Sequence, residues 1–245
     1  MRWKCTCEYE GTEFSGWQSQ PGGNTIQDHI EARLRWIFSR RTPIHGSGRT
    51  DTGVHALGQV FHFDGEWQHG PGKLLRAFRC GLPSSIGITG VEEADPNFHA
   101  RISAKKKCYK YYIFEGVPGA FNHRYNWCLG NRCLNFGAMQ NLTPHFHGKH
   151  NFSAFCANRG DGSVPSPFKT VGEMKFERFN RGIVFTVVAD GFLYKMVRML
   201  VGSFVMLGLG KISGDAVLGM LLSGKRIANV DVAPANGLFL HAVEY

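Results

Sequence analysis

Residues 170–189 read TVGEMKFERFNRGIVFTVVA, and this stretch decides the fold class. Polar and apolar side chains alternate over 173–177, and 183–189 is a nearly continuous apolar run, two patterns that are typical of buried strands. These patterns predict a long hairpin with strands at 170–179 and 183–189. Two apolar helices are expected after it, at 193–209 and 214–222. A hairpin followed by helices indicates a protein that mixes strands and helices in one fold.

The rest of the chain has the same mixed pattern. Further strands are expected at 3–9, 59–63, 86–91, 108–114 and 237–245, and further helices at 73–79 and near 134–140. Another helix opens at Asn24 and Thr25, with Asp28 in its first turn, and has one apolar face. That face consists of Ile26, Ile30, Leu34, Ile37 and Phe38. A basic junction at 104–107 separates two α+β halves of similar plan, residues 1–104 and 105–245, which we expect to share one broad, mixed, mainly antiparallel sheet.

Composition and charge narrow the class of protein. The chain has 245 residues and 43% hydrophobic residues, values that exclude disordered, collagen-like and coiled-coil proteins. Its 28 Lys and Arg against 19 Asp and Glu give a net charge of +9, which favours a polyanionic partner such as nucleic acid. The seven cysteines form no C-x-x-C pair, so a disulfide framework and a structural zinc site are not expected.

No membrane segment or nucleotide cofactor is expected. The longest nearly apolar run, 199–209, is too short to cross a bilayer, and the N-terminus lacks a secretory apolar stretch. The glycine motifs that bind nucleotide phosphates are missing from the sequence. A reduced, cytoplasmic protein is therefore expected.

The most unusual segment is GSGRTDTGVHA at residues 46–56. Its glycines let the backbone approach a ligand closely. In an extended chain Arg49 and Asp51 point the same way, so the arginine would hold the carboxylate ionised or bind a phosphate beside it. The same two residues also suit a structural ion pair in an Asx-turn, and spacing alone leaves both interpretations open.

Residues 48–56, GRTDTGVHA, resemble the catalytic motif of the tRNA pseudouridine synthase A family. Other segments resemble this family in the same order: YEGTEFSGWQSQP at 9–21, TIQ at 25–27, FHARISA at 98–104, YKYYI at 109–113, FLYKMVR at 192–198 and APANGLFL at 233–240. The resemblance spans nearly the whole chain. Ser47 and Thr52 stand where alanines are expected, and both are small enough for a tight loop.

This resemblance implies an isomerase that acts without a cofactor on uridine in tRNA. Asp51 would be the nucleophile of a reaction in which uracil is cut from ribose at N1, turned and rejoined through C5. A carboxylate suits this role because it is already ionised at neutral pH and needs no activating base. Attack at C6, attack at C1′ and a glycal route stay open. The family further implies that Arg198 pairs with Asp51, that Arg49 lies beside it, and that Tyr109 and Leu238 contact the target base.

The family also implies a fold and partners. Its fold has two ferredoxin-like or RRM-like halves with a central catalytic cleft, and its members are homodimers that act on tRNA positions 38 to 40 without a metal or a membrane. Basic side chains would bind the phosphates of such a substrate. The candidates are Arg40, Arg41, Arg76, Arg79, Arg101, Lys105, Lys106 and Lys107.

Two other functions compete with this one. A non-catalytic RNA-binding protein fits the charge and the aromatic strand, but it has little reason to place Asp51 near phosphates. A metal-dependent hydrolase would use HFHGKH at 145–150, or Asp51 with His55, but the histidine-rich stretch has no carboxylate nearby. Residues 145–150 and the loop 158–167 resemble the family least, and we assign them no role.

Overall fold

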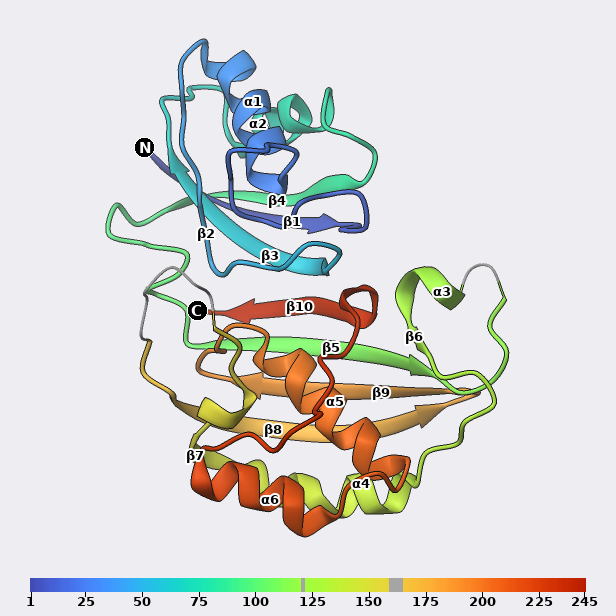
Figure 1. Ribbon diagram of the computed structural model, residues 1–245. Coiled ribbons are helices and arrows are strands. Elements are labelled where there is room, and N and C mark those ends of the chain that lie inside the picture. Colours follow the sequence, from blue (N-terminus) through green and yellow to red (C-terminus); the bar gives the residue numbers. More distant parts are fainter. Residues whose placement is uncertain (120–121, 159–164) are drawn as a thin grey trace. The chain divides into compact units, whose positions relative to one another are not determined.

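The computed structural model describes residues 1–119, 122–158 and 165–245, which form two compact units. Unit 1 comprises Met1–Lys105 and Phe239–Tyr245, and unit 2 comprises Lys106–Leu238. Each unit combines strands with helices, so the predicted α+β class is confirmed (Figure 1). The shared sheet, the central cleft and the roles of the two predicted halves stay predictions.

Unit 1 contains a sheet with helices on one face (Figure 1). Its strand order is β4 (Ile86–Ala94), β1 (Arg2–Tyr9), β3 (His55–Asp64) and β10 (Leu238–Glu244), with the short β2 (His45–Gly46) also paired to β3. The pairs β1–β3, β1–β4 and β2–β3 are antiparallel. Strand β10 runs parallel to β3, with Phe239 opposite His55. The helices are α1 (Ile26–Phe38) and α2 (Pro71–Arg79).

Local sequence explains the first helix and its packing. The Thr25 hydroxyl accepts the Asp28 amide N–H while the Asp28 carboxylate accepts the Thr25 N–H, so the two residues form a capping box at the start of α1. Ile26, Ile30 and Leu34 recur at helical spacing and are all buried. The predicted helix is therefore confirmed, and of its predicted apolar face Ile37 and Phe38 are half-buried.

Unit 2 contains the predicted hairpin. Its sheet has the order β5 (Lys106–Phe114), β9 (Gly182–Ala189), β8 (Phe168–Phe179) and β7 (Gly148–Asn151), all antiparallel, and β6 (Trp127–Cys128) lies parallel to β5. The helices are α3 (Asn122–Tyr125), α4 (Phe136–Leu142), α5 (Met196–Gly208) and α6 (Gly214–Ser223). Short 3₁₀ turns occupy Thr143–Phe146, Ser153–Phe155 and Ala235–Gly237.

Helix α5 lies across β8 and β9 in Figure 1, and an aromatic cluster joins them. The ring of Phe204 lies 5.1 Å from that of Phe176 and 6.2 Å from that of Phe185. All three side chains are buried, which explains why α5 is apolar on nearly every side.

Several details differ from the sequence-based expectations, and three of them have a clear physical reason. Helix α5 starts at Met196 and not at residue 193, because Lys195 takes a positive φ of 58° and the Met196 N–H closes a turn on the Leu193 carbonyl. Strand β3 starts at His55, four residues earlier than expected, because β10 pairs with its first residues. Strand β7 was not predicted, since its four polar residues carry no alternation.

Two further findings concern the loop 158–167 and the length of the helices. Of the loop 158–167, residues 159–164 lie outside the described part of the chain. Within the described residues, no helix has the length and apolar character needed to span a membrane.

Candidate active site

The loop 47–54 of unit 1 joins β2 to β3 and carries Arg49 and Asp51. Its backbone is held on both sides of Asp51. The Trp17 N–H donates to the Thr50 carbonyl at 3.1 Å, and the Val54 N–H donates to the Asp51 carbonyl at 3.1 Å. Gly53 completes this turn with a φ of 77°, a conformation that favours glycine. Asp51 itself is half-buried, so its carboxylate sits on a defined turn at the surface of the unit.

Two glycines in the segment after β1 let it pass directly against this loop. A Cβ atom on Gly11 would lie 2.0 Å from the Val54 carbonyl oxygen, and one on Gly16 would lie 2.7 Å from that of Thr50. Both distances are far shorter than a real Cβ contact. The glycines of YEGTEFSGW are therefore explained by their contact with the Asp51 loop, 40 residues later in the chain.

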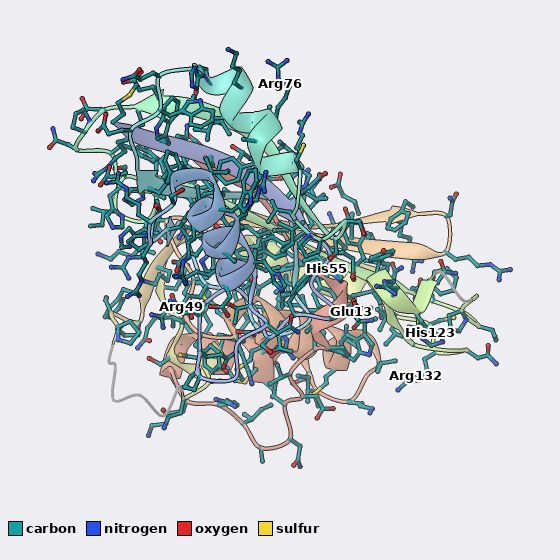
Figure 2. All side chains as sticks on the ribbon, turned by 90° about the horizontal axis from the view of Figure 1, so that it is seen from above. Glu13, Arg49, His55, Arg76, His123 and Arg132 are labelled. Carbon is teal, nitrogen blue, oxygen red and sulfur yellow. The ribbon has the colours of Figure 1, made fainter. Side chains whose placement is uncertain are left out.

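His55 follows the loop and anchors it to the same segment. Its side chain is buried, and its Nδ1 accepts the Gly11 N–H at 3.0 Å. The ring stacks on Phe239 of β10, with ring centroids 4.6 Å apart. Because its Nδ1 accepts a hydrogen bond from the Gly11 backbone, His55, labelled in Figure 2, has a supporting role next to the loop. Sequence reasoning had considered His55 only as a metal ligand.

Arg49, labelled in Figure 2, is exposed, and a row of hydrogen-bonded side chains connects it to α1. Its Nε donates to Gln18 Oε1 at 3.1 Å. Gln18 Nε2 then donates to Gln27 Oε1 at 2.7 Å, and Gln27 Nε2 donates to Glu31 Oε1 at 2.7 Å. The row orients the guanidinium of Arg49 at the surface of unit 1. Sequence reasoning missed Gln18 and Gln27, although both lie in segments that carry the family resemblance.

Arg198 lies in the first turn of α5 in unit 2 and is bound to the segment before β10. Its Nε donates to the Ala233 carbonyl at 2.7 Å, and the Ala233 N–H donates to the Arg198 carbonyl at 3.1 Å. A cation in the first turn opposes the helix dipole, so the helix alone does not explain an arginine there. The Nε bond sets the direction of the half-buried side chain, and the backbone bond fixes the first turn of α5 against Ala233.

Tyr109, Tyr111 and Leu238 belong to the same part of unit 2. Tyr109 is 7% exposed and meets the edge of Phe192, with centroids 5.0 Å apart. Tyr111, two residues along β5, donates its hydroxyl to the Pro234 carbonyl at 2.8 Å. Burial raises the pKa of Tyr111, although nearby Arg198 acts in the opposite direction. The phenol therefore stays protonated and serves as a donor to backbone.

The Tyr111 ring also supports the turn before Leu238. A Cβ atom on Gly237 would lie 2.7 Å from this ring, so the turn rests directly on it. Leu238 follows and is 6% exposed. Sequence reasoning missed Tyr111 as a supporting residue, although its spacing of two from Tyr109 was visible.

Comparisons with known proteins find similarity over the segments that carry most of these residues. The family model described as tRNA pseudouridine synthase matches residues 6–102 and 143–245. The chain belongs to the tRNA pseudouridine synthase family. The predicted enzyme class, an isomerase that converts uridine in tRNA to pseudouridine, is thereby confirmed. Asp51, Arg49, Arg198 and Leu238 lie inside the matched ranges, and Tyr109 lies between them.

Individual relatives are similar over their whole length. A protein of Bacillus subtilis (strain 168) named tRNA pseudouridine synthase A is 39% identical over 100% of this chain and 99% of its own. Proteins of the same name from Shouchella clausii and Acetivibrio thermocellus are each 37% identical, over 100% and 99% of this chain and 93% and 98% of their own. A solved structure titled "Crystal Structure of a Cbf5-Nop10-Gar1 Complex" aligns with 83% of this chain and 53% of its own at a TM-score of 0.35 and 13% identity.

The predicted site residues of the synthase are divided between its two units. Asp51 and Arg49 lie in unit 1, whereas Arg198, Tyr109 and Leu238 lie in unit 2. Inside each unit one other segment of the chain supports these residues. Residues 9–18 contact the loop that carries Arg49 and Asp51, and residues 233–237 contact Arg198 and form the turn before Leu238. The pairing of Asp51 with Arg198 stays a prediction, as do the individual roles.

The histidine-rich stretch 145–150 serves the β7–β8 hairpin. His147 Nε2 accepts the Met174 N–H at 3.3 Å, and His150 Nε2 lies 2.7 Å from the His147 carbonyl oxygen. Among the residues with described positions, no cluster of three or more His, Cys, Asp or Glu side chains is arranged to hold a metal ion. These contacts give His147 and His150 a structural explanation.

Proposed function

We propose that this synthase isomerises uridines at positions 38 to 40 in the anticodon stem-loop of tRNA, with Asp51 as the nucleophile. The observation that carries the proposal is the end-to-end similarity to proteins named tRNA pseudouridine synthase A, with Asp51 inside the matched residues. The rigid turn around Asp51 supports it, because a nucleophile must be held in place to be effective.

The chemistry needs only side chains of the protein. The bond between N1 and C1′ breaks and a bond between C5 and C1′ forms, while a proton leaves C5 and another binds N1, so no atom is gained or lost. Asp51 attacks C6 or C1′, or removes a proton from the sugar. Arg198 pairs with this carboxylate and keeps it ionised through parallel hydrogen bonds. No cofactor and no metal enter this scheme.

Binding requires the uridine to leave its stack. Extruding it costs a few kcal/mol, and stacking on an aromatic ring such as Tyr109 returns about 1–3 kcal/mol. Leu238 packs against the base, and the exposed Arg49 binds the backbone of the extruded nucleotide. Basic side chains supply the remaining binding free energy through contacts with phosphates, in keeping with the net charge of +9.

The wider setting follows from the family resemblance. We propose that the synthase works as a homodimer in the cytoplasm and that one tRNA contacts both subunits. A competing function as a non-catalytic RNA-binding protein predicts tRNA affinity without isomerisation, so one assay separates the two.

The test mixes purified protein with unmodified tRNA transcripts, without added cofactor or metal, and maps pseudouridine by chemical probing. We expect modification at positions 38 to 40. Asp51→Asn should fold and bind tRNA but form no pseudouridine, because the amide keeps the shape and loses the nucleophile. Asp215→Asn, at an exposed position of α6, is the matched control and should remain active. Turnover by Asp51→Asn would exclude this nucleophile, and modification at other positions would exclude the proposed site on tRNA.

A further inference from the structure

Beneath the Asp51 loop, the side chain of Gln59 on β3 is completely buried. We propose that Gln59 is a positioning residue, whose amide sets the geometry of the loop that carries Arg49 and Asp51. This inference rests on the proposed role of Asp51. It adds a residue that does not touch substrate and acts through the loop.

Three of the four hydrogen bonds of the Gln59 amide join it to the loop and to its own strand. Its Nε2 donates to the Gly48 carbonyl at 2.9 Å, and its Oε1 accepts the Ser47 hydroxyl at 2.7 Å. The same Oε1 accepts the Val60 N–H at 3.2 Å. Two of the three partners belong to the loop, directly before Arg49. The amide therefore holds the loop from the strand below it.

The groups bound to Gln59 require a side chain that both donates and accepts hydrogen bonds, as an amide does. A backbone N–H only donates and a backbone carbonyl only accepts, so the oxygen must face Val60 and the nitrogen must face Gly48. A carboxylate at this position has no proton for the Gly48 carbonyl. An apolar side chain leaves both loop groups without this partner in a buried place, which is costly.

A hydrogen bond to Thr50, the residue after Arg49, also anchors the loop. The Tyr9 hydroxyl and the Thr50 hydroxyl lie 2.8 Å apart in the interior, and Gln59 Nε2 lies 3.4 Å from the Tyr9 hydroxyl. Gly48 and Thr50 are thus both fixed from below, and Asp51 follows directly. Since a displacement of about 1 Å at a reacting group can cost on the order of 100-fold in rate, such anchoring bears on catalysis itself.

Gln59→Glu tests this role through pH. When the introduced carboxyl group is protonated, its O–H donates to Gly48 and its carbonyl oxygen accepts from Ser47 and Val60, so it replaces the amide. When it is ionised, an oxygen without a proton faces the Gly48 carbonyl and displaces the loop. Burial and this carbonyl both raise the pKa of the introduced group, so the working form is lost as pH rises through that pKa.

The measurement is the single-turnover rate of pseudouridine formation at saturating enzyme, from about pH 5.5 to about pH 8.5. Relative to wild type, Gln59→Glu should lose about 100-fold at the alkaline end and recover most of this loss at the acidic end. Gln140→Glu adds the same charge at an exposed position of α4 and should follow wild type throughout. Circular dichroism at each pH shows that the protein is folded, and tRNA affinity at each pH shows that the tRNA is fully bound, so the rates compare folded complexes only.

A purely structural role would change the folded fraction and leave the rate of the folded protein unchanged. Equal pH profiles for Gln59→Glu and wild type, or a rate loss that only follows unfolding, would overturn the inference. If Gln59→Glu does not fold, Tyr9→Phe tests the other end of the network: a roughly 10-fold slower single turnover with unchanged tRNA affinity supports it, and a wild-type rate overturns it. Inactive wild type, or active Asp51→Asn, would instead refute the proposed function.

Discussion

Replacing Gly11 by alanine adds one methyl group where the structure leaves no room for it. The new Cβ would lie 2.0 Å from the Val54 carbonyl oxygen, about 1.4 Å closer than the 3.4 Å at which ordinary contact begins. The clash is with backbone and cannot be relieved by rotating a side chain. The φ of Gly11 lies outside the range that favours glycine, so the effect of Gly11→Ala is steric alone.

To remove the clash, the segment after β1 and the turn of Asp51 and Val54 must separate by about 1.4 Å. A shift of about 1 Å at a catalytic group can cost on the order of 100-fold, so we expect the single-turnover rate to fall by at least about 100-fold. Overpacking of this kind also costs about 1–3 kcal/mol of stability, which lowers the Tm by roughly 2–12 °C in a protein of this size.

Both quantities can be measured on one preparation, by single-turnover assay at saturating enzyme and by thermal unfolding. Gly22→Ala is the matched control, since no atom lies within 4 Å of the Cβ built there and its φ is also ordinary. We expect wild-type rate and Tm for this control. A Gly11→Ala protein within about threefold of the wild-type rate and with an unchanged Tm would refute the argument that Gly11 is required by contact with the loop.

Three further predictions concern other parts of the molecule. Arg198→Lys should lose at least about 100-fold in single-turnover rate, because an ammonium cannot bind the Ala233 carbonyl and also hold a carboxylate through parallel bonds; full activity would show that Arg198 has another role. Replacing Lys105, Lys106 and Lys107 together with alanine should make the dependence of log tRNA affinity on log salt shallower by up to about 3, and an identical slope would remove them from the RNA contact. Burial and the neighbouring His99 and His45 lower the pKa of His62 to about 4, so the folded protein favours neutral imidazole and should lose up to about 3 kcal/mol as pH falls from about 6.5 to about 4. His62→Asn keeps an acceptor for the Ala100 N–H and should remove most of this loss in pH-dependent unfolding, whereas the same loss in the variant would contradict the assignment.

Local patterns in the sequence predicted most elements of the fold. The alternation over 173–177 and the apolar run over 183–189 are local features of the sequence, and the hairpin of β8 and β9 follows them. Thr25 and Asp28 mark the start of α1 because a capping box needs only residues three apart. The sequence was less informative for β7, whose polar residues become a strand only through pairing with β8.

The sequence by itself determined the family of this protein, and with it the prominence of Asp51, because the motif and the segments around it are contiguous and ordered along the chain. Only the tertiary structure decided what supports that loop. Gly11 and Gln18 lie in the segment between β1 and α1, Gln59 lies on β3, and no periodic pattern distinguishes a buried glutamine that binds a loop from one that faces water. The parallel pairing of β10 with β3, like the bond between Arg198 and Ala233, likewise joins residues far apart in the chain. Such contacts depend on how all elements pack together, so they cannot be derived from the local preferences of the residues involved.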